Sequence, residues 1–516
     1  MKIIKVLLTS VFIMMVIHTV KAQDVIKLKM PNSNKVVVKL MFRNGSITDP
    51  PGKEGLTQMT VSLMAQGGAG KLTYGDIQDR LYPWAAEYEA SVDKEVSVFT
   101  FQVPVVFATE FYPILRDVML NPAFDENDFK RVKTNQQNYV DQVIRASSDE
   151  EYSKKALEDF LFRGTNYQHM KEGKSKSVAA ITLDDIKNHY KNYFTKNNLQ
   201  IGITGNYSDD FLDQLNADMA KLSNVKPAIP VSGKANQPNG IEVEIISKEG
   251  AFGSAIFTGA PLSITRSDDD FAALMIANSW MGEHRKAYSR LYQKIRETRS
   301  MNYGDYSYIE WYENGGQNQL PPSGVPRHSN YWSIWIRPVQ IAKQLKEQYK
   351  ELANIKIGHA HFALRMAIRE FALLIKNGMT RDQFEETRNF LLSYTKLYAQ
   401  TPAAQLGWLM DSKFYGRDNY LKELDQLLRK VTLEDVNKAI RKYWQTDNMF
   451  VTIVTDVSEG EPLAKSIREN LDSPMSYSNL VKSGLPKAVL AEDAVVEKYK
   501  LNIKSVKIVK SEDTFK

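Results

Sequence analysis

One pattern of hydrophobic and polar positions occurs twice along the chain. Residues 181–206 align without gaps on residues 431–456, as ITLDDIKNHYKNYFTKNNLQIGITGN and VTLEDVNKAIRKYWQTDNMFVTIVTD. In each copy a threonine, Thr182 or Thr432, precedes an acidic first turn and about a dozen residues with helical apolar spacing. An apolar run follows, so each copy predicts a capped helix and then a buried strand.

A second similarity lies upstream of each copy. Residues 125–139 and 380–394 both predict the start of a long amphipathic helix. Residues 96–105 and 331–339 alternate in the manner of antiparallel strands. We therefore expect an α+β fold of two tandem homologous halves, each an antiparallel-rich sheet with helices packed on it.

The predicted halves are separated by a polar segment rich in glycine and proline, VSGKANQPNG. We expect an N-terminal half at 24–230, a linker at 231–240, a C-terminal half at 241–465 and a tail at 466–516. The tail contains a strand-like run at 501–509, whose docking the sequence does not place.

The amino terminus has the features of a secretory signal peptide. Residues 1–22 contain Lys2 and Lys5, an apolar stretch, and a small-residue cleavage site that ends at Ala22. The alternative is an uncleaved anchor, but the stretch is shorter than the about 20 residues that a membrane span needs. We expect an exported protein, periplasmic or extracellular, with no stable membrane span after cleavage.

Composition and charge exclude several classes of function. The chain has no cysteine, which rules out disulfides, cysteine-ligated metals and a cysteine nucleophile. Its net charge is +6, and the signal peptide accounts for three lysines and no acid. The mature chain is too weakly basic to indicate nucleic-acid binding.

Two motifs have ordinary structural interpretations. The run GGAGKLT at 67–73 departs from the phosphate-loop pattern and predicts a loop at a helix end. The seven histidines include no pair spaced by four, the spacing that HExxH and HxxEH zinc sites require. His359 and His361 are the one close pair, and we expect them to be solvated or half-buried helix residues.

The segment 290–308, RLYQKIRETRSMNYGDYSY, is the richest in site chemistry. Arg296 and Tyr303 are seven residues apart, which on a helix places them two turns apart on one face. A guanidinium and a phenol in that arrangement can converge on one oxygen-rich ligand. The alternative is a solvated arginine face beside core tyrosines.

Four segments resemble the pitrilysin/insulinase family of inverted-motif zinc peptidases. They are 42–68, 121–131, 181–206 and 289–304, in the order that the family has them. In that family HxxEH follows a glycine-leucine pair. Here Gly55 and Leu56 precede Gln58, Val61 and Ser62, which occupy the positions of the first ligand, the general base and the second ligand.

The resemblance implies a clam-shell of two halves and a zinc site that is absent from this chain. An amide, a hydroxyl and a valine cannot replace two imidazoles and a carboxylate at zinc. The family's downstream glutamate ligand would fall near 134–142, where there is no glutamate. Arg296 and Tyr303, in contrast, match an Arg/Tyr pair with which the family binds the substrate backbone or stabilises the oxyanion.

Three functions remain open. The first is a non-catalytic subunit of a heterodimeric zinc metallopeptidase, with an extended peptide as substrate and the zinc held by a homologous partner that carries HxxEH. The second is a peptide-binding or assembly module of the exported or envelope compartment, without hydrolysis. The third is a self-sufficient zinc peptidase with unusual ligands. A long polar loop at 313–330 has no assigned role; it is either a lid or solvated.

Overall fold

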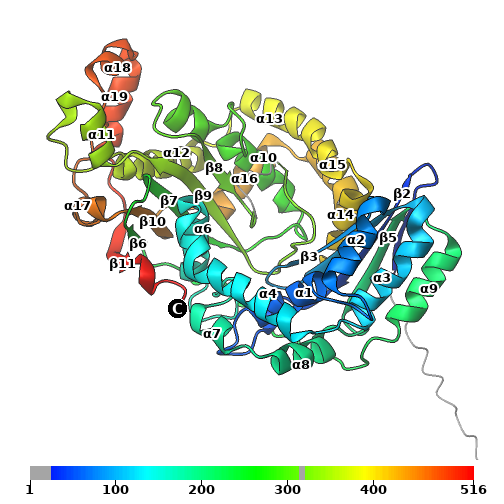
Figure 1. The fold of residues 1–516 in the computed structure, drawn as a ribbon. Coiled ribbons are helices and arrows are strands. Elements are labelled where there is room, and N and C mark those ends of the chain that lie inside the picture. Colours follow the sequence, from blue (N-terminus) through cyan, green and yellow to red (C-terminus); the bar gives the residue numbers. More distant parts are fainter. Residues whose placement is uncertain (1–24, 313–319) are drawn as a thin grey trace, which may run out of the picture.

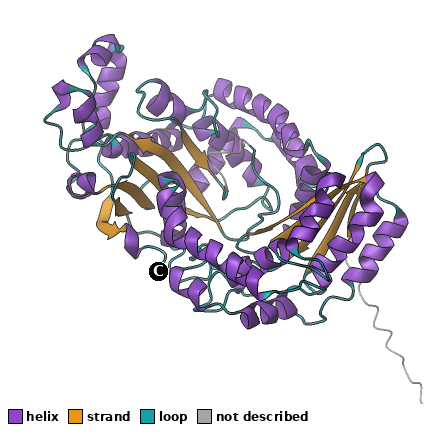
Figure 2. Cartoon of the chain, viewed as in Figure 1, coloured by secondary structure: helices purple, strands orange, loops and turns teal. Residues whose placement is uncertain are grey.

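The computed structural model describes residues 25–312 and 320–516. The predicted signal peptide at 1–22 lies outside the described residues. The chain forms two halves, each with one β-sheet and helices packed against it (Figure 1 and Figure 2). This arrangement confirms the predicted α+β fold of two tandem halves. In the described ranges, no helix combines the length and the apolar character needed to cross a bilayer.

The two sheets have the same topology. The first has the order β1-β5-β2-β4-β3 and the second the order β11-β6-β10-β7-β9-β8. In each sheet a parallel pair, β1 with β5 or β6 with β10, is followed by three antiparallel pairings. The strands are β1 (Val25–Lys29), β2 (Lys35–Phe42), β3 (Glu87–Val92), β4 (Ser97–Pro104), β5 (Leu199–Gly205), β6 (Ile241–Lys248), β7 (Ser254–Leu262), β8 (Asp305–Tyr308), β9 (Asn330–Val339), β10 (Met449–Asp456) and β11 (Ile503–Lys510).

The tail completes the second sheet. Its strand β11 pairs in parallel with β6 and covers the outer edge of that strand. The equivalent strand in the first sheet, β1, has no such neighbour among the described strands. An edge strand with unpaired backbone groups is prone to aggregation, and the added strand removes that hazard from β6.

The predicted helices occur where the repeat places them. Thr182 caps α8 and Thr432 caps α16, each through a capping box with the aspartate three residues on. The helices are α1 (Leu56–Gln66), α2 (Tyr74–Trp84), α3 (Ala108–Leu120), α4 (Glu126–Asn138), α5 (Ile144–Ala146), α6 (Asp149–Leu161), α7 (Ser175–Ala180), α8 (Leu183–Tyr193), α9 (Asp209–Met219), α10 (Asp270–Gly282), α11 (Ala342–Gln348), α12 (Ala360–Asn377), α13 (Arg381–Tyr394), α14 (Pro402–Phe414), α15 (Tyr420–Lys430), α16 (Leu433–Tyr443), α17 (Val457–Arg468), α18 (Asn479–Gly484) and α19 (Lys487–Val496). Two π-helical segments occupy Tyr139–Val143 and Tyr292–Glu297.

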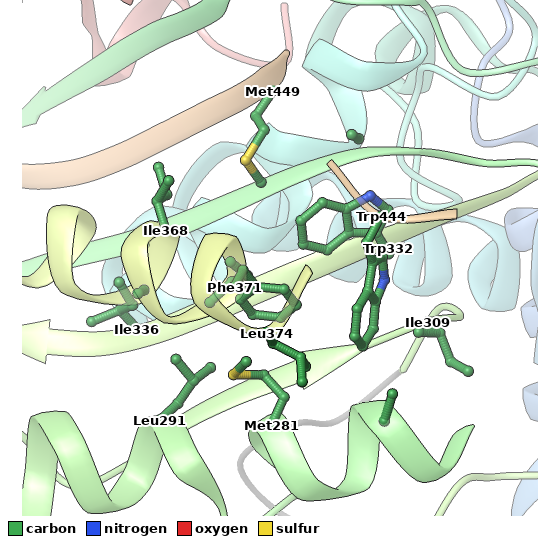
Figure 3. Packing of buried hydrophobic residues seen from close by; sticks show 14 of the residues in the cluster. Met281, Leu291, Ile309, Trp332, Ile336, Ile368, Phe371, Leu374, Trp444 and Met449 are labelled. Atoms are coloured by element: carbon green, nitrogen blue, oxygen red, sulfur yellow. The ribbon is translucent and has the colours of Figure 1, made fainter. Parts of the chain in front are cut away.

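The core of the second half lies between its sheet and the helices α10, α12 and α16 (Figure 3). Phe371 of α12 packs between two tryptophans, Trp332 and Trp444, with ring centroids 5.1 Å from each. Edge-on and tilted aromatic pairs of this kind add about 0.5–1.5 kcal/mol beyond the burial of their area. The sheet that supports the Arg/Tyr segment is thus anchored by a large aromatic core.

Two helices cross between the halves. Helix α6 precedes the linker in sequence but packs on β7 and β10 of the second sheet. Helix α14 belongs to the second half in sequence but packs on β1, β2 and β5 of the first sheet. Gly202 on β5 makes room for α14, because a Cβ there would lie 2.6 Å from the sulfur of Met410. Each sheet is therefore covered in part by a helix from the other half.

A buried cluster of charges joins the halves, and we name it the Arg327 junction. It consists of Asp93 and Lys94 from the β3–β4 turn, Glu158 from α6, and Arg327 from the segment before β9. Arg327 is 5% exposed and donates hydrogen bonds to both carboxylate oxygens of Asp93, at 2.6 and 2.7 Å, and to Glu158. At the described end of the polar loop at 313–330, Arg327 is therefore a buried anchor and not a solvated residue.

Candidate functional site

Helix α1 carries the degenerate zinc motif, and the residues before it fix where it begins. The Asp49 carboxylate accepts hydrogen bonds from the backbone N–H of Gly55 and of Thr57, both at 2.7 Å. Gly55 has φ +97, and a Cβ there would lie 2.6 Å from the carbonyl oxygen of Glu172. A glycine is required at this turn, which explains the glycine-leucine pair that precedes the motif.

The side chains at the three motif positions are either bonded to each other or buried in the core. The Gln58 amide donates a hydrogen bond to the Ser62 hydroxyl at 2.9 Å, so the two former ligand positions bind each other. Val61 is 1% exposed and packs in the core of the first half. Near the expected third ligand, the Gln136 amide donates to the carbonyl oxygens of Gly55 and Glu172 instead.

These side chains do not fit zinc. They offer an amide and a hydroxyl in place of imidazoles, and an alkyl group in place of the base. Over 25–312 and 320–516, moreover, no three His, Asp or Glu side chains gather as a group that could hold a metal ion.

Arg296 and Tyr303 do lie together. The Arg296 guanidinium carbon is 5.7 Å from the ring centroid of Tyr303 and 5.2 Å from that of Tyr292, and its Nε donates a hydrogen bond to the Tyr292 hydroxyl at 2.8 Å. Within the described part of the chain, the two terminal nitrogens of Arg296 and the hydroxyl of Tyr303 have no hydrogen-bond partner. The pair thus presents free donors.

The expected helical geometry of this pair is wrong, although the pairing is right. The π-helical segment ends at Glu297, and Ser300 has φ +52, which turns the chain back on itself. Tyr303 follows that turn, outside both the helix and β8, and is 74% exposed. A reversal of the chain, and not a shared helix face, brings the phenol to the guanidinium.

A cavity of about 690 Å³ opens at the pair. Phe252, 77% exposed on the β6–β7 turn, stands on its wall together with polar amides of α11. Asp305 is buried beside it, accepts a hydrogen bond from the Asn302 amide at 2.8 Å, and has its carboxyl pKa raised well above the ordinary value by burial. The lining residues are Phe252, Arg296, Glu297, Ser300, Met301, Asn302, Tyr303, Pro338, Val339, Gln340, Gln344 and Gln348.

The groups that hold this segment were not among the residues predicted from the sequence. The buried Arg299 donates to Asp493 and Glu492 of α19, both at 2.8 Å, and the Lys294 ammonium donates to Glu492 at 2.6 Å. These two basic residues flank Arg296, so the tail clamps the segment that carries it. The partners are 193 to 198 residues apart in sequence, and the only available signal was the acidic pair itself.

The two predicted sites belong to different halves. Helix α1 packs on β3 of the first sheet, whereas the segment with Arg296 packs on β8 and α12 (Figure 1).

The close histidine pair, His359 and His361, has a structural role. His359 is 3% exposed and bonds to the Ser476 carbonyl, and His361 is fully buried and bonds to the Ser466 hydroxyl. The expectation that both are solvated or half-buried is wrong.

Comparisons with known proteins agree with this picture. Residues 24–172 match the family model described as Insulinase (Peptidase family M16), and residues 180–391 match the Peptidase M16 inactive domain. A Helicobacter pylori relative named "Non-peptidase homolog YmxG" is 23% identical over 431 residues, which are 81% of this chain and 88% of the relative.

Two solved structures share the fold. A peptidase M16 inactive domain from Pseudomonas fluorescens superposes with a TM-score of 0.70 at 19% identity, over 84% of this chain and 95% of that chain. The periplasmic protease PqqL from Escherichia coli superposes with a TM-score of 0.61 at 13% identity, over 93% of this chain but 49% of that chain. With both family domains matched in order and the fold shared, the chain belongs to the insulinase family, peptidase family M16.

Proposed function

We propose that this chain is the non-catalytic subunit of a heterodimeric zinc metallopeptidase. Its partner would be a homologous subunit that carries HxxEH and holds the zinc, and the substrate would be an extended peptide. The observation that carries the proposal is the contrast between the two sites. Gln58 and Ser62 bind each other on α1, whereas Arg296 and Tyr303 present unpaired donors at an open cavity on the other half.

The length of the fold supports an assembly of two chains. PqqL has the same fold, and this chain matches 49% of it. A second chain of similar size would supply what the rest of PqqL supplies in a single polypeptide. The tail clamp on the segment of Arg296 supports the same role, because a residue that acts on another chain's substrate must be held rigidly.

The donors of Arg296 and Tyr303 would act on the substrate. A guanidinium and a phenol bind carbonyl oxygens of an extended peptide, and they bind more strongly when negative charge develops on the oxygen. The zinc of the partner would supply the activated water. One well-placed donor of this kind is worth about 3 kcal/mol, or about a hundredfold in rate.

The test is the peptidase rate of this chain mixed with an HxxEH homologue from the same source. Arg296→Ala and Tyr303→Phe should each lower the kcat of the complex by about a hundredfold. Arg381→Ala, at an exposed arginine on α13, is the matched control and should leave the rate unchanged. Equal rates for the Arg296→Ala complex and the wild type, or failure to copurify with any such homologue, would exclude the proposal.

A second candidate is a peptide-binding or assembly module without hydrolysis. It is supported by β3, which ends the first sheet and pairs only with β4 among the described strands, so that an extended peptide can add to its free edge. This candidate predicts peptide binding by the isolated chain and no peptidase activity with any partner. Both candidates place the protein in an exported or envelope compartment, which amino-terminal sequencing of the mature protein would test.

A further inference from the structure

Glu283 lies at the centre of a group of tyrosines in the second half. It follows α10 directly, and α13, β8 and the segments beside them surround it. Burial first, and the negative charge of Glu283 in addition, raise the pKa of five phenols. They are Tyr288, Tyr308, Tyr312, Tyr394 and Tyr398. The charge of one carboxylate therefore reaches five phenols, from the 283–312 region and from the end of α13 and the turn after it.

Within the described part of the chain, this carboxylate forms no ion pair. Glu283 is half-buried, and in the described part of the chain no Lys, Arg or His nitrogen lies within 4.0 Å of it. The nearest candidate, the Lys286 ammonium, lies instead over the ring of Tyr394, 4.7 Å from its centroid. Burial raises the pKa of the Glu283 carboxyl, while Ser279 and Lys286 partly oppose the rise. A carboxylate withdrawn from water without an ion-pair partner favours any cation that can reach it.

The cavities around Glu283 allow access. A wide cavity of about 550 Å³ is lined by Lys286, Tyr394 and the 320–323 segment. A narrow one of about 50 Å³ is lined by Glu283, His284 and further aromatic rings. The two share Pro321, Tyr398 and Trp408 on their walls, so the wide cavity lies directly beside the narrow one. The narrow end has room for the tip of a side chain but not for a backbone.

His284 supplies a second unused polar atom at the narrow end. It is 2% exposed; its Nδ1 lies 2.5 Å from the Tyr308 hydroxyl, and its Nε2 is buried without a partner. Burial lowers the pKa of this imidazole to about 3, so the ring is neutral. The tautomer with its proton on Nδ1 donates to the Tyr308 hydroxyl, and its Nε2 then keeps a lone pair that can accept a hydrogen bond.

We propose that the pocket formed by Glu283, His284 and the surrounding tyrosines binds the cationic end of a lysine or arginine side chain of a peptide. A carboxylate, an imidazole lone pair and aromatic ring faces are all partners for an ammonium or guanidinium group. The other acid of the pocket, Glu310, is already paired with Arg266 at 2.7 Å, which leaves Glu283 as the open site. The inference deepens the proposed function, because it names the side-chain class of the peptide, and it rests on that function for the ligand being a peptide.

The test is calorimetric titration of the full mature chain, without any partner subunit. The probes are a capped pentapeptide of alanines with a central lysine and the same peptide with a central norleucine. The lysine peptide should bind at least about tenfold more tightly than the norleucine peptide. Glu283→Gln should abolish this preference, and Glu386→Gln, at an exposed glutamate of α13, should preserve it.

A second variant should strengthen the binding of the lysine peptide. Lys286→Met removes the ammonium that now occupies the ring face of Tyr394, so it should tighten lysine-peptide binding severalfold. Equal binding of the two peptides by the wild type, or weaker lysine-peptide binding by Lys286→Met, would overturn the proposal. So would a Glu283→Gln chain that keeps the preference and melts like the wild type. These outcomes leave the role of Arg296 untouched, because that role is measured as the rate of the two-chain complex.

Discussion

Replacing Arg327 with methionine tests whether the Arg327 junction holds the two halves together. The substitution keeps most of the aliphatic stem but leaves Asp93 and Glu158, both nearly buried, with Lys94 as the remaining cation, 3.5 Å from Glu158. Removing one partner from a buried ion pair costs about 3–5 kcal/mol, because the other partner stays buried and uncompensated. The contact of the guanidinium with the Trp311 ring, 4.2 Å away, is lost as well. We expect Arg327→Met to lower the free energy of unfolding by about 4 kcal/mol.

The assay is denaturant-induced unfolding followed by tryptophan fluorescence and by circular dichroism together, because a chain with two halves need not unfold in one step. Arg163→Met is the matched control, since Arg163 pairs with Glu244 and Asp159 at the surface and should cost about 1 kcal/mol or less. Adding Asp93→Asn to Arg327→Met restores charge balance and should recover at least about half of the loss. An Arg327→Met chain as stable as Arg163→Met would refute the reasoning.

The remaining predictions concern the pH dependence of stability, the N-terminal caps of α8 and α16, and the contacts of the tail with Arg299. Burial lowers the pKa of His189 and of His359 to about 4, from 6.5, so the unfolded chain takes up protons that the folded chain refuses. The free energy of unfolding should therefore fall by about 2 kcal/mol per histidine as the pH is lowered from 7 to 5. In His189→Gln, denaturation measured at several pH values should show a smaller fall. Thr182→Ala and Thr432→Ala should each cost about 1 kcal/mol in the same assay, equally, because both remove a capping box. Glu492→Gln with Asp493→Asn should leave Arg299 without its carboxylates and speed amide hydrogen exchange across 292–303, whereas exchange in α8 should not change.

The sequence was informative where the signal is local. The threonine caps at Thr182 and Thr432 and the strands that follow them depend on neighbouring residues, and the structure has them as expected. Arg296 and Tyr303 were matched by spacing, but the turn at Ser300 that joins them has no pattern from which to predict it. The two side chains do lie close together, but a reversal of the chain brings them together and helical spacing does not.

Long-range partners could not be predicted. Glu492 and Asp493 meet Arg299 across 193 and 194 residues of sequence, and the tyrosines around Glu283 come from elements spread over more than a hundred residues. His359 and His361 can be buried because Ser476 and Ser466 supply their hydrogen-bond partners. Burial of a polar side chain depends on such partners, which helical periodicity does not reveal.

The exchange of α6 and α14 sets the order in which this protein can fold as it is made. The strands of the first sheet are complete at Gly205, but the helix that covers β1, β2 and β5 ends at Phe414. At a synthesis rate of about 5–20 residues per second, the apolar face of that sheet waits roughly 10–40 s for its cover. During that interval the nascent first half exposes an apolar surface to water, and halves made separately by dividing the chain at the 231–240 linker would each lack the helix that covers part of its sheet.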